Sequence, residues 1–313
     1  MKALVKYAKG PGNIGLREIE EPRCAPAEVK IEVKACGICY TDIHILHDQY
    51  PWQLLLPLGH EYSGVVVEVG TEVRNFKVGD RITGCGAGGF AKYLVTSEDR
   101  FLFHLPDSLS FEEGALFEPL SACTHAVVDA SGITPMDLAL VTGPGSIGLC
   151  AMQVAKACGA VVAITGTAKD KERLALAEKL GAELAINIDE QDPVKLIDEL
   201  SQHQGVDAVI ECSGAQAAVD LGLKLIKNGK IYTQVGLSGK PYSVDLDHVV
   251  YNRLTIASSI GFRQESWSAS IGLVERGIVN VKDIISHRFS LEDWEEGFRI
   301  CENREGLKVL IIP

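Results

Sequence analysis

The chain has 313 residues, of which 46% are hydrophobic, and a formal net charge of −12 at pH 7. This length exceeds what one ordinary hydrophobic core supports, so two domains are expected. The acidic balance argues against nucleic acid and anionic membranes as partners, because both bind basic surfaces. No apolar run approaches the ~20 residues that span a bilayer. Nine scattered cysteines and the absence of a signal peptide at Met1 predict a cytoplasmic protein with reduced thiols.

The N-terminal third of the chain is predicted to form short strands separated by Gly and Pro. The strand candidates cover residues 3–7, 29–33, 63–69, 80–83, 91–96 and 101–105. This rhythm indicates an antiparallel, barrel-like domain rather than repeated βαβ units.

From Met136 onward the pattern alternates between strand and helix. Strand candidates cover residues 138–142, 160–165, 184–188, 208–211, 231–235 and 254–257, and helix candidates cover 146–157 and 171–180. Such alternation predicts a parallel, doubly wound sheet. A helix at 267–276 and a strand at 309–312 follow, and we expect this segment to return to the first domain. The predicted domains are therefore 1–125 with 263–313, and 126–262.

Possible zinc ligands occur in three separate places along the chain. Cys39 follows Cys36 in a CxxC, His60 and Glu61 are adjacent, and Glu118 lies further on. A thiolate, an imidazole and carboxylates are the donor mixture of zinc sites that keep one position open for substrate. The wide spacing means that the fold itself must assemble the ligands, as in catalytic sites. We assign Cys39 and His60 as ligands. Glu61 and Glu118 compete for the third protein position, or each is used in a different state.

Each candidate has an alternative interpretation. The CxxC also fits a redox pair or half a zinc knuckle, but no second CxxC completes a knuckle, and Cys36 is interpreted as a buried structural thiol. Asp42 is a candidate to accept a hydrogen bond from the His60 ring and fix its tautomer, or it is a turn residue. His44 either passes a proton to solvent or is an ordinary surface histidine.

A glycine-rich turn lies between a predicted strand and a predicted helix. Gly143-x-Gly145-x-x-Gly148 in this context is a dinucleotide-binding signature, because its glycines permit a tight turn and a close approach to pyrophosphate. The amides at the helix start favour phosphate, and a ligand-free turn is the alternative. The predicted cofactor contacts are Gly143, Gly145, Ser146, Ile147, Gly148, Gly166, Thr167, Lys171, Arg173, Ser213, Val235 and Gly236.

The chain resembles the zinc-dependent medium-chain dehydrogenase/reductase family in a series of motifs. In chain order these are GICYTD (37–42), GHE (59–61), VGDR (78–81), EPL (118–120) and the glycine turn. The resemblance covers essentially the whole chain. Within the family, the chain resembles the sorbitol, threonine and butanediol dehydrogenase branch, whose members also have a carboxylate in the EPL motif. The liver alcohol dehydrogenase branch has a cysteine at that position. The implied α/β fold is a GroES-like β-barrel catalytic domain plus a Rossmann domain, with the active site in the cleft between them.

The resemblance also implies an activity and an assembly. The expected reaction is hydride transfer between a secondary alcohol or polyol and NAD(P), in a dimer or tetramer. Zinc held by Cys39, His60 and a carboxylate would act as a Lewis acid on the substrate oxygen. Thr41 would accept the alcohol proton and relay it, through the cofactor ribose, towards His44. The candidate substrate contacts are Tyr50, Trp52 and Arg263.

Two features depart from that branch. The lobe with four cysteines that holds a structural zinc is reduced to residues 84–88, where Cys85 is the only cysteine, so one zinc per chain is expected. The second Rossmann strand ends at Gly166 without the acidic residue that binds the adenosine ribose. Thr167, Lys171 and Arg173 then favour NADP over NAD, although nearby acidic residues dilute their charge.

Two other functions stay open at this point. A zinc-free quinone or enone reductase can have the same fold, although Cys39, His60 and Glu118 argue against it. A non-enzymatic, crystallin-like protein that retains cofactor binding is the second alternative, which turnover of secondary alcohols would exclude.

Overall fold

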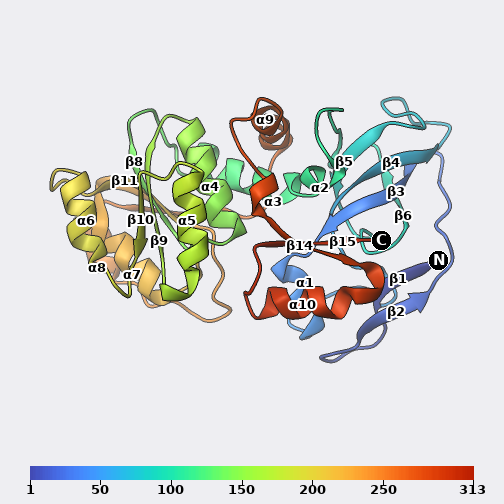
Figure 1. Cartoon of the computed structure of the whole chain (residues 1–313), viewed down its shortest axis with the longest axis horizontal. Helices are drawn as coiled ribbons and strands as arrows, with labels where there is room; N and C mark the ends of the chain where they lie inside the picture. Colours follow the sequence, from blue (N-terminus) through green and yellow to red (C-terminus); the bar gives the residue numbers. More distant parts are fainter. The chain divides into compact units, whose positions relative to one another are not determined.

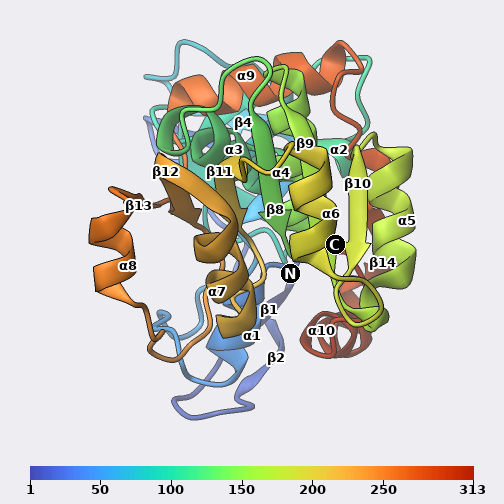
Figure 2. The same cartoon turned by 90° about the vertical axis from the view of Figure 1, so that its left-hand side faces the viewer.

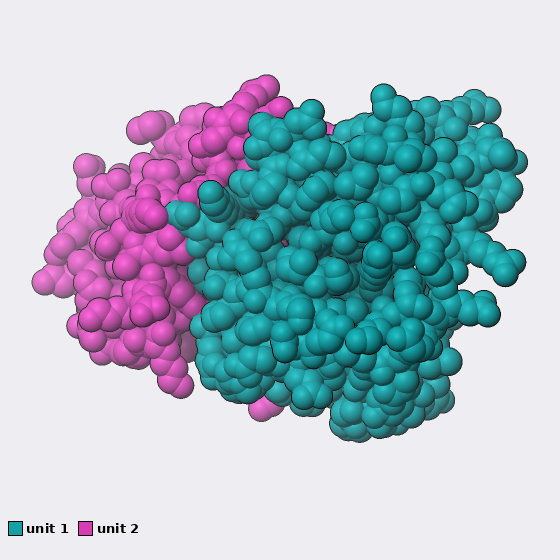
Figure 3. All heavy atoms as spheres, turned by 45° about the vertical axis from the view of Figure 1, so that its right-hand side comes forward, with its two compact units in different colours: residues 1–118, 281–313 teal, residues 119–280 magenta.

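The computed structural model describes residues 1–313, and both ends of the chain belong to the same one of its two units. Unit 1 comprises Met1–Glu118 and Val281–Pro313, and unit 2 comprises Pro119–Asn280 (Figure 3). The predicted boundaries lay at 125/126 and 262/263. Unit 2 is longer at both ends because its own hydrogen bonds hold the added segments. Thr124 Oγ1 lies 2.8 Å from Ser270 Oγ, and Asn280 N donates to Gln153 Oε1 at 2.7 Å.

Unit 1 is built on a seven-stranded sheet with the order β14-β15-β3-β4-β5-β7, in which β6 also pairs with β3. All its pairs are antiparallel except β14 with β15, and β1 and β2 form a separate hairpin. The elements are β1 (Lys2–Lys6), β2 (Ile14–Glu18), β3 (Glu28–Gly37), α1 (Tyr40–Leu46), β4 (Glu61–Val69), β5 (Arg81–Cys85), β6 (Tyr93–Ser97), β7 (Leu102–His104), α2 (Phe111–Gly114), η3 (Lys282–Ile284), β14 (Ile285–Ser290), η4 (Leu291–Asp293), α10 (Trp294–Glu302) and β15 (Lys308–Ile312). Helix α3 (Phe117–Thr124) contains the first boundary between the units.

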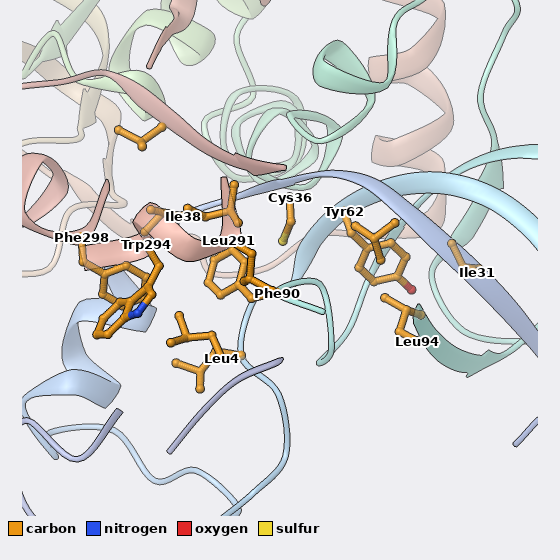
Figure 4. Close-up of a cluster of buried hydrophobic side chains, with 14 of the residues drawn as sticks. Leu4, Ile31, Cys36, Ile38, Tyr62, Phe90, Leu94, Leu291, Trp294 and Phe298 are labelled. Atoms are coloured by element: carbon orange, nitrogen blue, oxygen red, sulfur yellow. The ribbon is translucent and has the colours of Figure 1, made fainter. Parts of the chain in front are cut away.

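The C-terminal segment returns to the N-terminal strands, as the sequence predicted. Strand β15 pairs with β3 through Leu310 opposite Gly37, and α10 lies beside α1 (Figure 1). The core between them is apolar, and Phe298 packs edge-on against Phe90 and Trp294 (Figure 4). Cys36 is completely buried in the same cluster, which confirms its interpretation as a structural thiol.

Unit 2 is a six-stranded sheet, all parallel, with the order β10-β9-β8-β11-β12-β13. Its elements are η1 (His125–Ala130), β8 (Leu138–Thr142), α4 (Ser146–Ala157), β9 (Val161–Gly166), η2 (Ala168–Asp170), α5 (Lys171–Lys179), β10 (Leu184–Asn187), α6 (Pro193–Leu200), β11 (Val206–Glu211), α7 (Gln216–Leu225), β12 (Ile226–Gln234), α8 (Leu246–Tyr251), β13 (Thr255–Ser258) and α9 (Gln264–Glu275). The predicted doubly wound sheet is thus confirmed. The strand order changes direction between β8 and β11, where ligands bind in such folds. None of the helices in the chain combines the length and the apolar character that crossing a bilayer requires.

Candidate metal centre and cofactor-binding turns

Helix α1 positions the first candidate metal ligand. Cys39 caps its N-terminus, and the Asp42 carboxylate accepts a hydrogen bond from the Cys39 backbone amide at 2.9 Å. At the other end of the helix, the buried Lys6 ammonium donates to the Ile45 carbonyl at 2.9 Å and pairs with Asp48 at 3.0 Å. The helix is therefore held at both ends, which fixes the thiol that precedes it.

Three of the predicted ligands are brought together by the fold. The ligand atoms of Cys39, His60 and Glu61 all lie within 4.8 Å of one another, with Glu61 at the start of β4. Gly37, opposite Glu61 in the β3–β4 ladder, is required here because a Cβ would collide with the Glu61 carboxylate. Since Cys39 and His60 are only partly buried, the group is open on one side.

Asp42 lies behind His60. Its Oδ1 atom is buried without a hydrogen-bond partner, and it is 4.0 Å from His60 Nδ1, which is longer than a hydrogen bond. Burial lowers the pKa of His60, but the hydrogen bond to Cys39 and the Asp42 carboxylate outweigh burial and raise it well above its usual value. The surroundings of His60 therefore favour a positive charge on or beside its ring.

Glu118 lies outside the three-residue group but interacts with it electrostatically. Burial and the Glu61 carboxylate raise the pKa of Glu118 to about 7, whereas His60 and Lys308 oppose this rise. Two buried carboxylates with mutual repulsion are costly without a cation between them. The sequence left Glu61 and Glu118 as competitors, and the geometry places Glu61 nearer to the thiol and imidazole.

Lys308 is a residue of this site that sequence reasoning missed. Its ammonium group is buried at the start of β15, pairs with the Glu61 carboxylate and donates to the Ile38 carbonyl at 3.3 Å. Burial lowers the pKa of Lys308, but Glu61 and Cys39 raise it above its ordinary value. No motif marks this lysine, because 247 residues separate it from Glu61 in the chain.

Cys85 is a second neighbour of this group that no motif marked. It is the last residue of β5 and stands opposite Glu61 in the β4–β5 ladder. Burial raises the pKa of this thiol, and the charges of Glu118, Glu61 and Cys39 raise it further. Cys85 thus borders the candidate metal group, although it is not one of its three residues.

The predicted proton-transfer residues both lie on α1. Thr41 Oγ1 is 3.5 Å from Cys39 Sγ, so this hydroxyl borders the candidate metal position. His44 Nδ1 is 2.9 Å from the Gln49 side-chain oxygen, which accepts and therefore places the ring proton on Nδ1. The free basic nitrogen of His44 is then Nε2.

The predicted substrate residues have different surroundings. Tyr50 is exposed in the segment after α1, whereas the indole N–H of Trp52 donates to the Leu56 carbonyl at 3.0 Å and its ring packs on the unit 1 core. Arg263 is exposed and belongs to unit 2, where it caps helix α9.

The predicted cofactor contacts gather in unit 2 at the ends of neighbouring strands. Gly143 follows β8, Ser213 follows β11, and Val235 and Gly236 follow β12. Helix α4 begins at Ser146 with Gly145 as its N-cap, so its first amides face the turn. This is the arrangement that the glycine spacing predicted.

The end of β9 differs in detail from the expectation. The Thr167 hydroxyl donates to Asp170 at 2.8 Å, and Arg173 also contacts Asp170 at 3.3 Å. Two carboxylates therefore lie at the strand end, Asp170 and also Asp189, which accepts from Ala168 N at 2.8 Å. A Cβ at Gly166 would lie 2.8 Å from Pro144 Cγ, so Gly166 leaves room for the glycine turn.

These residues fit a zinc ion and a dinucleotide. The thiol, imidazole and carboxylate lie within 4.8 Å of one another and are the donor types that zinc sites use. Zinc sites also place a carboxylate behind the histidine ligand, and here a buried Asp42 oxygen without a partner lies behind the imidazole. The turns after β8, β11 and β12 provide amides and small residues at the switch point of a parallel sheet.

Stabilisation by zinc should grow with pH. Its surroundings raise the pKa of Glu118 from the usual 4.5 to about 7. Protonated Glu118 therefore contributes folding stability that is fully present below about pH 4.5 and is lost as the pH rises through about 7. Zinc instead needs the ionised carboxylate. Below the pKa of a ligand, zinc affinity falls by about tenfold for each unit by which the pH is lowered, for each proton that zinc displaces. At a fixed free zinc concentration, calorimetry should give a larger zinc-induced rise in Tm at about pH 8 than at about pH 6. An equal rise would show that Glu118 does not take part.

Two family models match the chain. The model described as zinc-binding dehydrogenase covers residues 146–276, and that described as alcohol dehydrogenase GroES-like domain covers residues 25–107. A sorbitol dehydrogenase from Halalkalibacterium halodurans is 35% identical over 343 positions, covering 100% of this chain and 99% of that protein. An L-threonine 3-dehydrogenase from Bacillus velezensis is 36% identical, with 100% and 99% covered.

Solved structures agree with the sequence relatives. The 2R,3R-butanediol dehydrogenase of Bacillus subtilis matches with a TM-score of 0.90 at 30% identity, covering 100% of this chain and 99% of that chain. A zinc-binding dehydrogenase from Sinorhizobium meliloti 1021, bound to NADP, matches with a TM-score of 0.90 at 29% identity and the same coverage. The predicted combination of a GroES-like domain and a Rossmann domain is confirmed.

Proposed function

Because the chain belongs to the zinc-dependent medium-chain dehydrogenase/reductase family, we propose that Cys39, His60 and a carboxylate hold its zinc ion. As a member of this family, the chain is an oxidoreductase that acts on alcohols or polyols with NAD(P). Either Glu61 or Glu118 provides that carboxylate. The observation that carries the proposal is the convergence of Cys39, His60 and Glu61 within 4.8 Å. Metal analysis of variants at these positions, described in the Discussion, tests it.

The other residues of unit 1 have separate tasks in this reaction. Zinc, when bound, supplies a Lewis acid for the substrate oxygen, and the nicotinamide supplies the hydride acceptor. The Asp42 carboxylate, 4.0 Å from the His60 ring, supports that ring electrostatically, and Lys308 holds the Glu61 carboxylate through a buried ion pair. The Thr41 hydroxyl accepts the alcohol proton and passes its own proton towards His44.

We propose a single zinc ion per chain. One thiolate, Cys85, cannot form the closed tetrahedral site of a structural zinc. The sorbitol dehydrogenase alignment extends over 343 positions against 313 residues here, which supports the loss of a segment from this chain. Cys85 borders the catalytic group instead.

We propose NADP as the preferred cofactor. Gly166 offers no carboxylate to repel a 2′-phosphate, and Arg173 and Lys171 stand at the start of α5. Asp170 is partly neutralised by Arg173. A substitution at Gly166 would press on Pro144, so residue 173 provides the cleaner test.

Arg173→Ala should raise the KM for NADP by about tenfold and leave the KM for NAD unchanged, because a charge-assisted hydrogen bond to phosphate is lost. Lys179→Ala, which removes a positive charge from the last turn of the same helix, is the matched control. The measurement is kcat/KM for both cofactors in each protein. A parent enzyme strongly selective for NAD would contradict the proposal.

We also propose that the chain forms a homo-oligomer through the edge of the unit 2 sheet. Strand β13 is the last strand of the sheet, and α8 lies at the same edge (Figure 2). Exposed apolar side chains gather there, namely Leu246, Val250, Tyr251, Ile256 and Ile260. Light scattering should show an oligomer that Ile256→Lys dissociates and that Met136→Lys, at an exposed apolar position elsewhere, leaves intact. A monomeric parent would contradict this proposal.

A further inference from the structure

Glu211 is a completely buried carboxylate at the end of β11, and it takes no part in metal binding or proton transfer. Its oxygens accept hydrogen bonds from Thr142 Oγ1 at 3.2 Å, from the amide (2.7 Å) and the hydroxyl of Ser213, from Gly214 N at 3.0 Å, and from Gln234 Nε2 at 2.6 Å. Every partner donates, so the group is complementary to an ionised carboxylate.

The partners of Glu211 come from three different turns. Thr142 ends β8 just before Gly143, Ser213 lies two residues after the end of β11, and Gln234 ends β12. These three strands are neighbours, and β8 and β11 lie on the two sides of the point where the strand order reverses. Ligands of doubly wound sheets bind at this point, beyond the carboxyl ends of the strands. One carboxylate therefore connects the three turns that contain the predicted cofactor contacts Gly143, Ser213 and Gly236.

The three turns are packed without spare room. A Cβ on Gly143 would lie 2.7 Å from Ser213 Cβ, and a Cβ on Gly236 would lie 2.6 Å from Glu211 Oε2. The Glu211 carbonyl also accepts from the amides of Val235 and Gly236 at 2.9 and 2.8 Å. A shift of the carboxylate would therefore move the glycine turn and the turn after β12 together.

We infer that Glu211 is a positioning residue for the nicotinamide dinucleotide, which sets the spacing of the turns after β8, β11 and β12. It acts through Thr142, Ser213 and Gln234 and does not touch the cofactor itself, since an anion offers no attraction to phosphate. Burying a charged carboxylate has a desolvation cost that an apolar residue would avoid. Here the hydrogen bonds of the buried carboxylate hold three turns in place at the carboxyl ends of the strands. The inference rests on the proposed cofactor contacts in these turns.

Glu211→Gln tests this role. Glutamine has the same size, but its NH₂ group must face at least one N–H or O–H donor, so the network cannot be fully satisfied. The Kd of the preferred dinucleotide should rise at least about tenfold. The KM for the cofactor should rise in parallel, whereas kcat at saturating cofactor and the zinc content should stay at the parental values.

Asp207→Asn is the matched control. Asp207 lies near the opposite end of the same strand, where it accepts from Leu138 N at 3.0 Å and Lys227 Nζ at 2.9 Å. This variant should lower Tm without changing the Kd of the dinucleotide. If Glu211→Gln also lowers Tm and binds the dinucleotide with the parental Kd, its role is structural only and the inference is overturned.

Thr142→Val covers the case in which Glu211→Gln does not fold. Valine keeps the shape of threonine and removes one donor, so the Kd should rise by about threefold with the fold intact. A parental Kd in Thr142→Val would then refute the inference. A parent chain that binds neither NAD nor NADP would refute the proposed cofactor chemistry instead, so the two failures are distinguishable.

Discussion

The His60→Ala variant is expected to fold, to lose its zinc ion and to lose at least about a thousandfold in turnover. Three protein ligands leave no redundancy, and the Lewis acid contributes several kcal/mol of transition-state stabilisation. His60 is partly exposed and is not one of the apolar residues of the unit 1 core, so the fold should survive its replacement. Elemental analysis and kcat with an alcohol substrate are the measurements. Cys39→Ser should behave in the same way.

The control for this prediction is His47→Ala. His47 is a partly exposed histidine one residue beyond α1, and its ring pairs with Glu302 at 2.5 Å. Loss of such a surface pair costs at most about 1 kcal/mol of stability, and zinc content and turnover should be unchanged. A metal-free His60→Ala protein with near-parental turnover would contradict the assignment of the metal site.

Gly145→Ala and Gly148→Ala are expected to damage the glycine turn in different ways. An added Cβ at Gly145 meets no atom within 4 Å, so alanine should fold normally, but its methyl group occupies the space through which pyrophosphate approaches the backbone. The Kd of the dinucleotide should rise by about a hundredfold. At Gly148 the Cβ would collide with the Gly143 carbonyl, which should cost roughly 1–3 kcal/mol of stability.

Calorimetry and dinucleotide titration of both variants separate the two effects. Gly145→Ala should keep the parental Tm and bind the cofactor poorly, whereas Gly148→Ala should show a lower Tm before any ligand is added. If Gly145→Ala binds NAD and NADP as the parent does, the turn carries no phosphate, and the alternative of a ligand-free turn is correct.

The sequence predicted those parts of the structure that have a local signal. The glycine spacing marked the turn between β8 and α4, and the alternation of apolar strands with helices indicated the parallel sheet. Cys39 and His60 were recognisable because each lies in a short motif. Helix α6 also carried a signal that was missed, since Asp192 caps it by accepting from Val194 N and Pro193 occupies its first position.

The parts that were missed depend on contacts between distant segments. Lys308 and Glu61 meet only because β15 lies against β3, and a single lysine before an apolar strand has no periodicity to detect. Glu211 resembles any acidic residue that follows a buried strand until its donors from three turns are seen together. Strand β14 alternates only weakly between buried and exposed residues, and so it was not predicted.

The central claim, that one zinc ion per chain supports alcohol oxidation, is tested most directly by a zinc titration of the metal-free parent protein. The rate of NAD(P)H formation is measured with the best substrate from a panel of polyols and secondary alcohols, at increasing ratios of zinc to chain. The rate should rise in proportion to zinc and level off at one zinc per chain. A full rate before zinc is added, as a zinc-free reductase would give, or a plateau at two zinc ions per chain would contradict the claim.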